Sequence, residues 1–166
     1  MGRRVCSPLR SGRAAGALLL GIAAAVSAHE GEPVVMGPPP PTGFYTVSPC
    51  RLIDTRNAAG ARGGPALAAA STRSFPVSGA CNIPATATSV SVNVAAVGPA
   101  TAGYLTVYRG ASATAPLVST VNFAAGVTRA NNAIVALAVD GTGTIDVKNG
   151  SAGTVHFVLD VNGYVE

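Results

Sequence analysis

Two-residue alternation of apolar and polar residues is the feature that most constrains the fold of this 166-residue chain. It is clearest at residues 89–94, where three valines alternate with Ser89, Ser91 and Asn93. Successive side chains of an extended strand point to opposite faces, so this pattern predicts one buried and one solvent-facing side. Similar short runs recur along the chain between Gly and Pro residues, and none has the period of a helix.

The same pattern predicts nine strands, at 44–47, 51–54, 72–77, 88–97, 103–109, 118–123, 131–138, 143–147 and 154–161. Connections rich in Gly and Asn, such as 98–103 and 149–153, supply the residues that tight antiparallel turns require. The segment 57–70 has no periodicity and is expected to be a long surface loop. We therefore expect an all-β fold, an antiparallel β-sandwich of jelly-roll or Greek-key type with one disulfide.

The amino-terminal 28 residues have the layout of a secretory signal peptide, with four arginines, an apolar run at 14–26 and small residues at 26–28. A Pro- and Gly-rich linker at 29–42 and a β-sandwich domain at 43–166 follow. We expect a secreted or extracellular protein, associated with the cell surface, without a membrane span in the mature chain. The alternative is a signal segment that is kept as an anchor.

Charge is evenly balanced once the leader is removed. The leader carries four of the 11 Lys and Arg residues and none of the seven Asp and Glu residues, which leaves seven of each sign. A chain without excess positive charge lacks the basic surface that attracts the phosphates of a nucleic acid. Nucleic-acid binding is therefore not expected.

Two cysteines, Cys50 and Cys81, follow the leader, whereas Cys6 lies within it. An even pair of cysteines in an exported chain indicates a disulfide between them. Two thiols alone make a poor zinc site, because structural zinc takes four ligands.

The stretch at residues 48–56 places Asp54 between Arg51 and Arg56, among apolar residues. Asp160 lies on the closing strand, where alternation places it opposite the buried side chains. Because Arg binds a carboxylate with two parallel hydrogen bonds, we interpret these four residues as a structural ion-pair cluster. The alternative is a glycosidase carboxylate pair, but neighbouring arginines lower a carboxyl pKa, which is unsuitable for a general acid. No catalytic residues are expected.

Two segments have residues that could bind a metal, but neither is expected to do so. His29, the first residue after the expected cleavage point, could bind copper together with His156, but it precedes a flexible spacer. The segment from Asp140 to Asp146 suggests a calcium loop, although its Gly and Thr content is more typical of a hairpin turn. We expect neither a metal nor a cofactor.

Tyr104 and Tyr108 are the candidate ligand platform, because their even spacing places both on one face of a strand. Exposed aromatic rings are the usual stacking surface for sugars, and this chain has no Trp. The alternative is that these tyrosines, like Tyr45 and Tyr164, pack at the edges of the sandwich.

Five blocks, at residues 44–56, 89–94, 103–108, 121–126 and 158–164, resemble a module of secreted and surface proteins of high-GC and gliding bacteria. They include PCRLIDTR, GYLTVY, NFAAG and DVNGY. The resemblance covers residues 44–165 and implies an all-β extracellular module, found alone or beside hydrolase and adhesive domains, without established catalytic residues.

We expect a non-enzymatic surface module for attachment or assembly, whose partner is a cell-surface glycan or another surface protein. The first alternative is a carbohydrate-binding module that acts on cell-wall or other polysaccharide. The second is a small secreted enzyme, either copper-dependent or hydrolytic.

Overall fold

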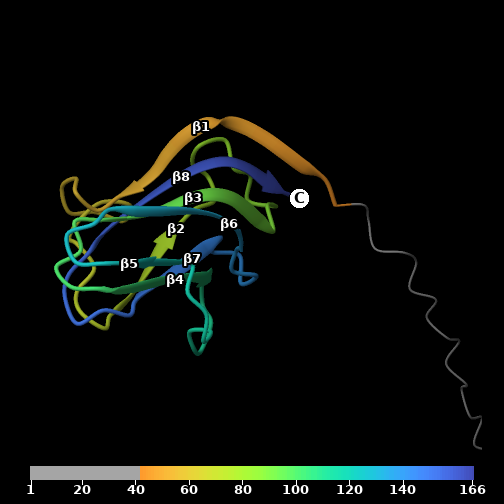
Figure 1. Cartoon of the computed structure of the whole chain (residues 1–166). Coiled ribbons are helices and arrows are strands. Elements are labelled where there is room, and N and C mark those ends of the chain that lie inside the picture. Colours follow the sequence, from red (N-terminus) through yellow and green to blue (C-terminus); the bar gives the residue numbers. More distant parts are fainter. Residues whose placement is uncertain (1–41) are drawn as a thin grey trace, which may run out of the picture. The chain divides into compact units, whose positions relative to one another are not determined.

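The computed structural model describes residues 42–166, so the signal peptide, Cys6, His29 and nearly all of the expected linker lie outside the described residues. The described chain forms two four-stranded sheets that stack face to face (Figure 1). The eight strands are β1 (Phe44–Asp54), β2 (Thr72–Pro76), β3 (Ser89–Val97), β4 (Gly103–Arg109), β5 (Val121–Phe123), β6 (Arg129–Ala136), β7 (Thr144–Asn149) and β8 (His156–Val165).

The first sheet has the strand order β1-β8-β3-β6, and the second has the order β2-β7-β4-β5. Every pairing within the two sheets is antiparallel. Eight strands that cross between two sheets in this order form a jelly roll, which is built from two Greek keys. The expected antiparallel sandwich is therefore confirmed, in its jelly-roll form.

The expected number of nine strands is wrong, because the first two expected strands form the single strand β1. The register between β1 and β8 shifts between Thr46 and Cys50 and again between Arg51 and Ile53. Pro49 lies in the first irregular stretch, and proline has no N–H to donate to a ladder. The local sequence pattern therefore predicts two strands, whereas the chain forms one irregular edge strand.

Strand β5 is shorter than the expected 118–123, and the segment before Val121 is bound to β4 by side-chain hydrogen bonds besides the backbone bond from Thr120 N to the carbonyl of Leu105 at 2.8 Å. Thr106 Oγ1 donates to the carbonyl of Val118 at 2.6 Å, and Val107 N donates to Thr120 Oγ1 at 2.8 Å. These bonds fasten the segment before β5 to the central strand β4.

The core lies between the inner faces of the two sheets. The alternation expected in β3 is confirmed, since Val90, Val92 and Val94 are fully buried while their neighbours are partly exposed. The rings of Phe75 and Phe157, from the two different sheets, meet at 5.4 Å between centroids. Aromatic pairs at this separation add to the stabilisation that apolar burial provides.

The segment 57–70 is held to the sandwich by arginine side chains, although it has few strand pairings of its own. Arg62 Nε donates to the carbonyl of Pro76 at 2.9 Å. Arg73 lies over the ring of Phe75 and donates to three carbonyls, those of Gly60, Gly64 and Pro65. These guanidinium groups bind backbone carbonyls of the loop and of β2, and so connect the two segments.

Candidate functional site

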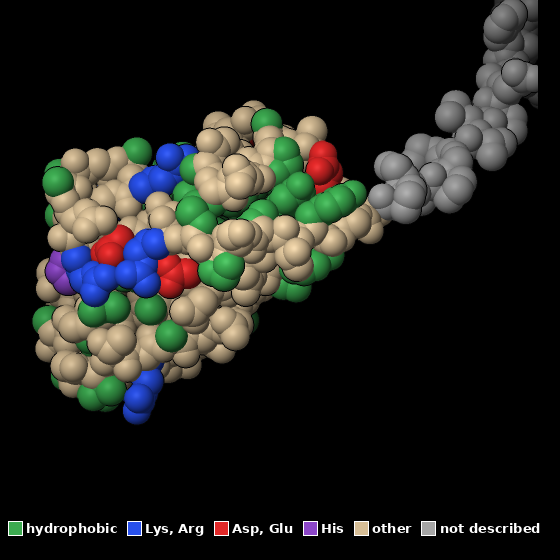
Figure 2. Space-filling view, turned by 90° about the horizontal axis from the view of Figure 1, so that it is seen from above, with side chains coloured by type: hydrophobic (Ala, Val, Ile, Leu, Met, Phe, Trp, Pro, Cys, Tyr) green, Lys and Arg blue, Asp and Glu red, His purple; other side chains and the backbone are tan. Residues whose placement is uncertain are grey.

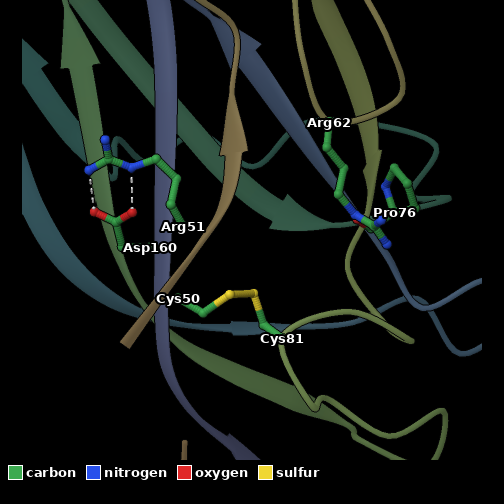
Figure 3. Close-up of a disulfide and its surroundings, with 6 residues drawn as sticks. All are labelled: Cys50, Arg51, Arg62, Pro76, Cys81 and Asp160. Atoms are coloured by element: carbon green, nitrogen blue, oxygen red, sulfur yellow. Dashed lines mark hydrogen bonds and ion pairs between the residues drawn. A yellow bond between two sulfur atoms is a disulfide. The ribbon is translucent and has the colours of Figure 1, made fainter. Parts of the chain in front are cut away.

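The four residues of the expected ion-pair cluster gather on the outer face of the first sheet. Arg51 of β1 is paired in register with Asp160 of β8. Its Nε and NH2 atoms donate to the two carboxylate oxygens of Asp160 at 2.8 and 3.0 Å (Figure 3). Figure 2 shows acidic and basic side chains together on this face, with most of the surrounding surface uncharged.

Asp54 is the buried member of the cluster, with 6% of its surface exposed. Its carboxylate accepts hydrogen bonds from Arg56 Nε at 2.8 Å, Arg56 NH2 at 2.6 Å and the backbone N of Arg56 at 3.1 Å. The side-chain hydrogen bond from Arg56 is the main cause that lowers the pKa of Asp54 from 3.8 to about 2, against the opposing effect of burial. Asp54 is therefore ionised at any ordinary pH and cannot serve as a general acid.

A buried threonine ties the end of this cluster to the closing strand. Thr55 is 1% exposed, and its Oγ1 accepts a hydrogen bond from the backbone N of Phe157 at 2.8 Å. The same oxygen lies 3.2 Å from Nδ1 of His156, the only histidine among the described residues. Since the hydroxyl is buried and already accepts a hydrogen bond, the geometry does not present it as a nucleophile.

The expected disulfide between Cys50 and Cys81 is confirmed, with the two Cα atoms 5.8 Å apart. It joins edge strand β1 to the loop between β2 and β3, and Arg51 beside it reaches Asp160 (Figure 3). The cross-link therefore anchors the irregular edge strand directly beside the ion pairs.

Tyr104 lies on the outer face of the second sheet, opposite the ion-pair cluster. A Cβ atom added to Gly150 would overlap the Cζ, Cε1 and Cε2 atoms of the Tyr104 ring together. Because it would meet all three atoms at once, Gly150 lies under the face of the ring and not beyond its edge. The ring therefore rests flat on the backbone of Gly150, and only glycine permits this approach.

The turn under the ring is made rigid by Asn149, which is fully buried. Its Nδ2 donates to the carbonyls of Ala68 and Gly153, each at 2.8 Å. Its Oδ1 accepts hydrogen bonds from the backbone N and the Oγ of Ser151, at 3.0 and 2.7 Å. All the hydrogen-bonding capacity of this amide is used by the turn and by the loop that contains Ala68, so the base of the aromatic ring is fixed.

Tyr104 lines a groove of about 300 Å³ between the sheet and the loop that joins β4 to β5. The loop contributes the apolar segment 116–118, of which Leu117 is fully exposed. Asn122 of β5 and Lys148 of β7 contribute polar groups, and Asn122 Nδ2 donates to Ser119 Oγ at 2.9 Å. The groove thus combines one flat aromatic ring with an amide and an ammonium group. Ligand sites typically combine an apolar surface with a few such polar groups.

Tyr108 lies on the same outer face as Tyr104, as expected, with the buried Thr106 between them. It borders a second, shallower hollow of about 450 Å³, lined in part by Arg109 and Thr114. The two tyrosines therefore lie beside neighbouring hollows, which share Pro116 in their linings.

Sequence reasoning missed the importance of Gly150 and Lys148. Gly150 was expected only as a turn residue, since nothing local links it to a tyrosine 46 positions earlier. Lys148 could have been predicted from sequence. It follows the expected strand at 143–147 directly, and if that strand is extended by one residue, alternation places Lys148 on the outer face.

The described residues hold no group of three His, Cys, Asp or Glu side chains suited to one metal ion. The turn at Asp140 joins β6 to β7, which belong to different sheets, so the expected hairpin is wrong. Asp140 Oδ1 accepts hydrogen bonds from Thr142 N at 3.0 Å and Thr142 Oγ1 at 2.6 Å. These hydrogen bonds lower the pKa of Asp140, the side-chain bond most strongly. Asp146 lies on the outer face of β7, in register with Ser74 and Tyr108.

Within residues 42–166, no helix has the length and hydropathy that a membrane crossing requires.

Comparison with known proteins leaves the fold as the main finding. No family model matches the sequence, and no curated protein matches it. Among solved structures, the chain is similar to the coat protein of Tobacco streak virus, with a TM-score of 0.34 and 10% sequence identity. That match covers 76% of this chain and 89% of the coat protein chain. The structure itself shows a two-sheet sandwich with a disulfide, and its all-β architecture is the coarse part of what the resemblance to bacterial surface modules implies.

Proposed function

We propose that this protein is an exported, non-catalytic attachment module that binds polysaccharide in the groove beside Tyr104. The observation that carries this proposal is the flat packing of the Tyr104 ring on Gly150, at the edge of a groove of about 300 Å³. A tyrosine that only sealed the edge of the sandwich would pack against side chains of the core. This ring instead lies on a turn and keeps 36% of its surface exposed.

Sugar rings stack on such a surface through their apolar faces, while nearby amide and charged groups bind their hydroxyls. Asn122 and Lys148 provide groups of both kinds at the groove. Both belong to strands of the sheet, and Thr106 and Thr120 fasten the loop that forms the opposite wall. A groove on a fixed frame loses little freedom when it binds, which favours attachment.

The state of the acidic residues supports a role without catalysis. Asp54 and Asp160, the two carboxylates embedded in strands β1 and β8, are each bound bidentately by an arginine. A glycosidase needs one carboxyl group that stays protonated near neutral pH and a second across an open cleft. Asp54 has the opposite property, because the Arg56 guanidinium lowers its pKa to about 2.

The test is binding of the full chain to a panel of insoluble polysaccharides, including cell-wall glycan, chitin and cellulose. Tyr104→Ala should abolish pull-down, because it removes the stacking surface, which typically contributes about 1 to 3 kcal/mol per aromatic ring. Gly150→Ala should weaken binding in the same direction, because its methyl group displaces the ring.

Tyr45→Ala is the matched control, since Tyr45 is 48% exposed but lies on the first sheet, stacked on Tyr164. Its binding should equal that of the wild type. Retention of the glycan by the Tyr104→Ala variant, or equal losses in the Tyr104 and Tyr45 variants, would count against the groove as the binding site.

A further inference from the structure

Lys148 is the only lysine in the sequence, and it lies on β7 at the groove. The register places it between Thr72 of β2 and Thr106 of β4, on the outer face of the second sheet. Its side chain is partly buried and lines the same groove as Tyr104 and Asn122. It is also the only charged residue in the lining of that groove.

The fold makes no use of the charge of Lys148. None of the ion pairs in the described part of the chain involves it, and the same is true of Arg109 and Arg129, whereas the four other arginines of that part are engaged. Those arginines bind either carboxylates or backbone carbonyls, and they are Arg51, Arg56, Arg62 and Arg73. Asp146, two residues before Lys148 on the same face, forms no ion pair with it.

We propose that the groove selects a sugar unit that carries an anionic group, a carboxylate or a sulfate, which Lys148 binds while Tyr104 stacks against the ring. This inference rests on the proposed function and names its ligand class. A sugar that carries an anionic substituent can make both contacts at once. Its ring stacks on the tyrosine while its anionic group binds the ammonium. The groove holds no negative side chain that would repel such a ligand.

The physical basis is the strength of a hydrogen bond between two charged groups. Such a bond is about twice as strong as one between neutral groups. The segment 116–118 adds apolar surface at the edge of the groove, where Leu117 is fully exposed. Asn122 has a free carbonyl oxygen, because its Nδ2 is the atom that bonds to Ser119, and this oxygen can accept from a sugar hydroxyl.

The experiment measures binding of the full chain to four soluble polymers by affinity electrophoresis. Polygalacturonate carries carboxylates, its methyl ester is neutral, dextran sulfate carries sulfates, and dextran is neutral. We expect at least one acidic polymer to bind about tenfold more tightly than its neutral counterpart, the factor that one charge-assisted hydrogen bond provides. The two acidic polymers distinguish a carboxylate ligand from a sulfate ligand.

Lys148→Met should reduce binding of the acidic polymer to the level of the neutral one, and Lys148→Arg should keep most of it. The control is Arg129→Met, which removes an exposed cation from β6, away from the groove, and should change nothing. Because Lys148 is the only lysine, its acetylation can also be followed by mass spectrometry, and the acidic polymer should protect it. All variants should keep the melting temperature of the wild type.

Distinct outcomes overturn the two proposals. Equal, Tyr104-dependent binding of acidic and neutral polymers would overturn the anionic selectivity alone. Equal losses in Lys148→Met and Arg129→Met would also overturn it, because they would indicate diffuse attraction and not a site. Absence of binding to every polymer and to the insoluble glycans would overturn the proposed function itself.

Discussion

Replacing Asp54 with asparagine removes the one buried carboxylate of the ion-pair cluster and tests what that cluster does. The carboxylate is almost completely buried and accepts three hydrogen bonds from Arg56. Asparagine has nearly the same size, but its amide group carries no charge and presents an N–H donor where the guanidinium requires an acceptor. The variant therefore removes the interaction with little change in packing.

The lowered pKa of Asp54 allows its contribution to the free energy of unfolding to be calculated. A fall from 3.8 to about 2, at about 1.36 kcal/mol for each pKa unit, is equivalent to about 2.5 kcal/mol. The arginine side chains are about half exposed, at 52% for Arg51 and 45% for Arg56, so solvent screens part of this interaction. We expect the carboxylate of Asp54 to contribute about 1 to 2 kcal/mol to the free energy of unfolding.

The contribution of Asp54 to stability should decrease as the pH is lowered. Because the pKa is lower in the folded state, the contribution is complete above the unfolded value of 3.8, decreases as the pH falls, and is lost below about 2. Urea unfolding between pH 5 and pH 2 should therefore show a steeper loss of stability in the wild type than in Asp54→Asn.

Asp140→Asn is the control, since Asp140 also has a lowered pKa but lies in an exposed turn. It should leave the acid dependence close to that of the wild type. Parallel curves for the wild type and Asp54→Asn over this pH range would refute the assignment of a structural role to Asp54.

Two further changes test the surroundings of this cluster. Arg56→Ala should lower the melting temperature more than Arg109→Ala, because Arg56 leaves a buried carboxylate behind while Arg109 ends β4 without an ion pair among the described residues; equal shifts in thermal denaturation would contradict this. Reduction of the Cys50–Cys81 bond should lower the free energy of unfolding by about 3 to 4 kcal/mol while circular dichroism keeps the β-sheet signal, since loop closure acts mainly on the unfolded chain; loss of that signal would contradict this.

The fold class could be predicted from sequence because it depends on local periodicity. Strands such as β3 carry their alternation in consecutive residues, so the buried and exposed sides follow from the sequence alone. The sheet order could not be predicted, because β1 pairs with β8 from the opposite end of the chain. The number of strands was wrong for a related reason, since the continuity of β1 depends on its irregular pairing with β8.

The ion-pair cluster was more accessible from sequence than the groove. Arg51, Asp54 and Arg56 are close in the sequence, and Asp160 is recognisable because it is embedded in a strand among apolar neighbours. The sequence could not assign the partners, which depend on the register that sets Arg51 opposite Asp160. Alternation also failed to predict the burial of Val158, which lies on the same face of β8 as Asp160 but is only 3% exposed.

The groove was harder to predict because it is assembled from three parts of the chain. The distance in sequence between Tyr104 and Gly150 is 46 residues, and their contact arises only because Gly150 N donates to the carbonyl of Tyr104 at 2.9 Å. Lys148 reaches the same place through the pairing of β7 with β4. A tyrosine pair at even spacing indicated the correct face, but it gave no information about which ring has a groove beside it.

The two outer faces of the sandwich differ in how far the fold satisfies their charged groups. On the first sheet, Asp54 and Asp160 are paired with arginines, so removing a charge there breaks hydrogen bonds that the folded chain uses and should reduce stability. On the second sheet, the ammonium of Lys148 lacks an ion-pair partner within residues 42–166, so its removal leaves nothing unpaired. A charged group that folding does not use, beside a ring that is held flat and exposed, is explained more simply by a ligand than by stability. Loss of binding without loss of stability at Lys148, together with the reverse at Asp54, is the pattern that this division predicts.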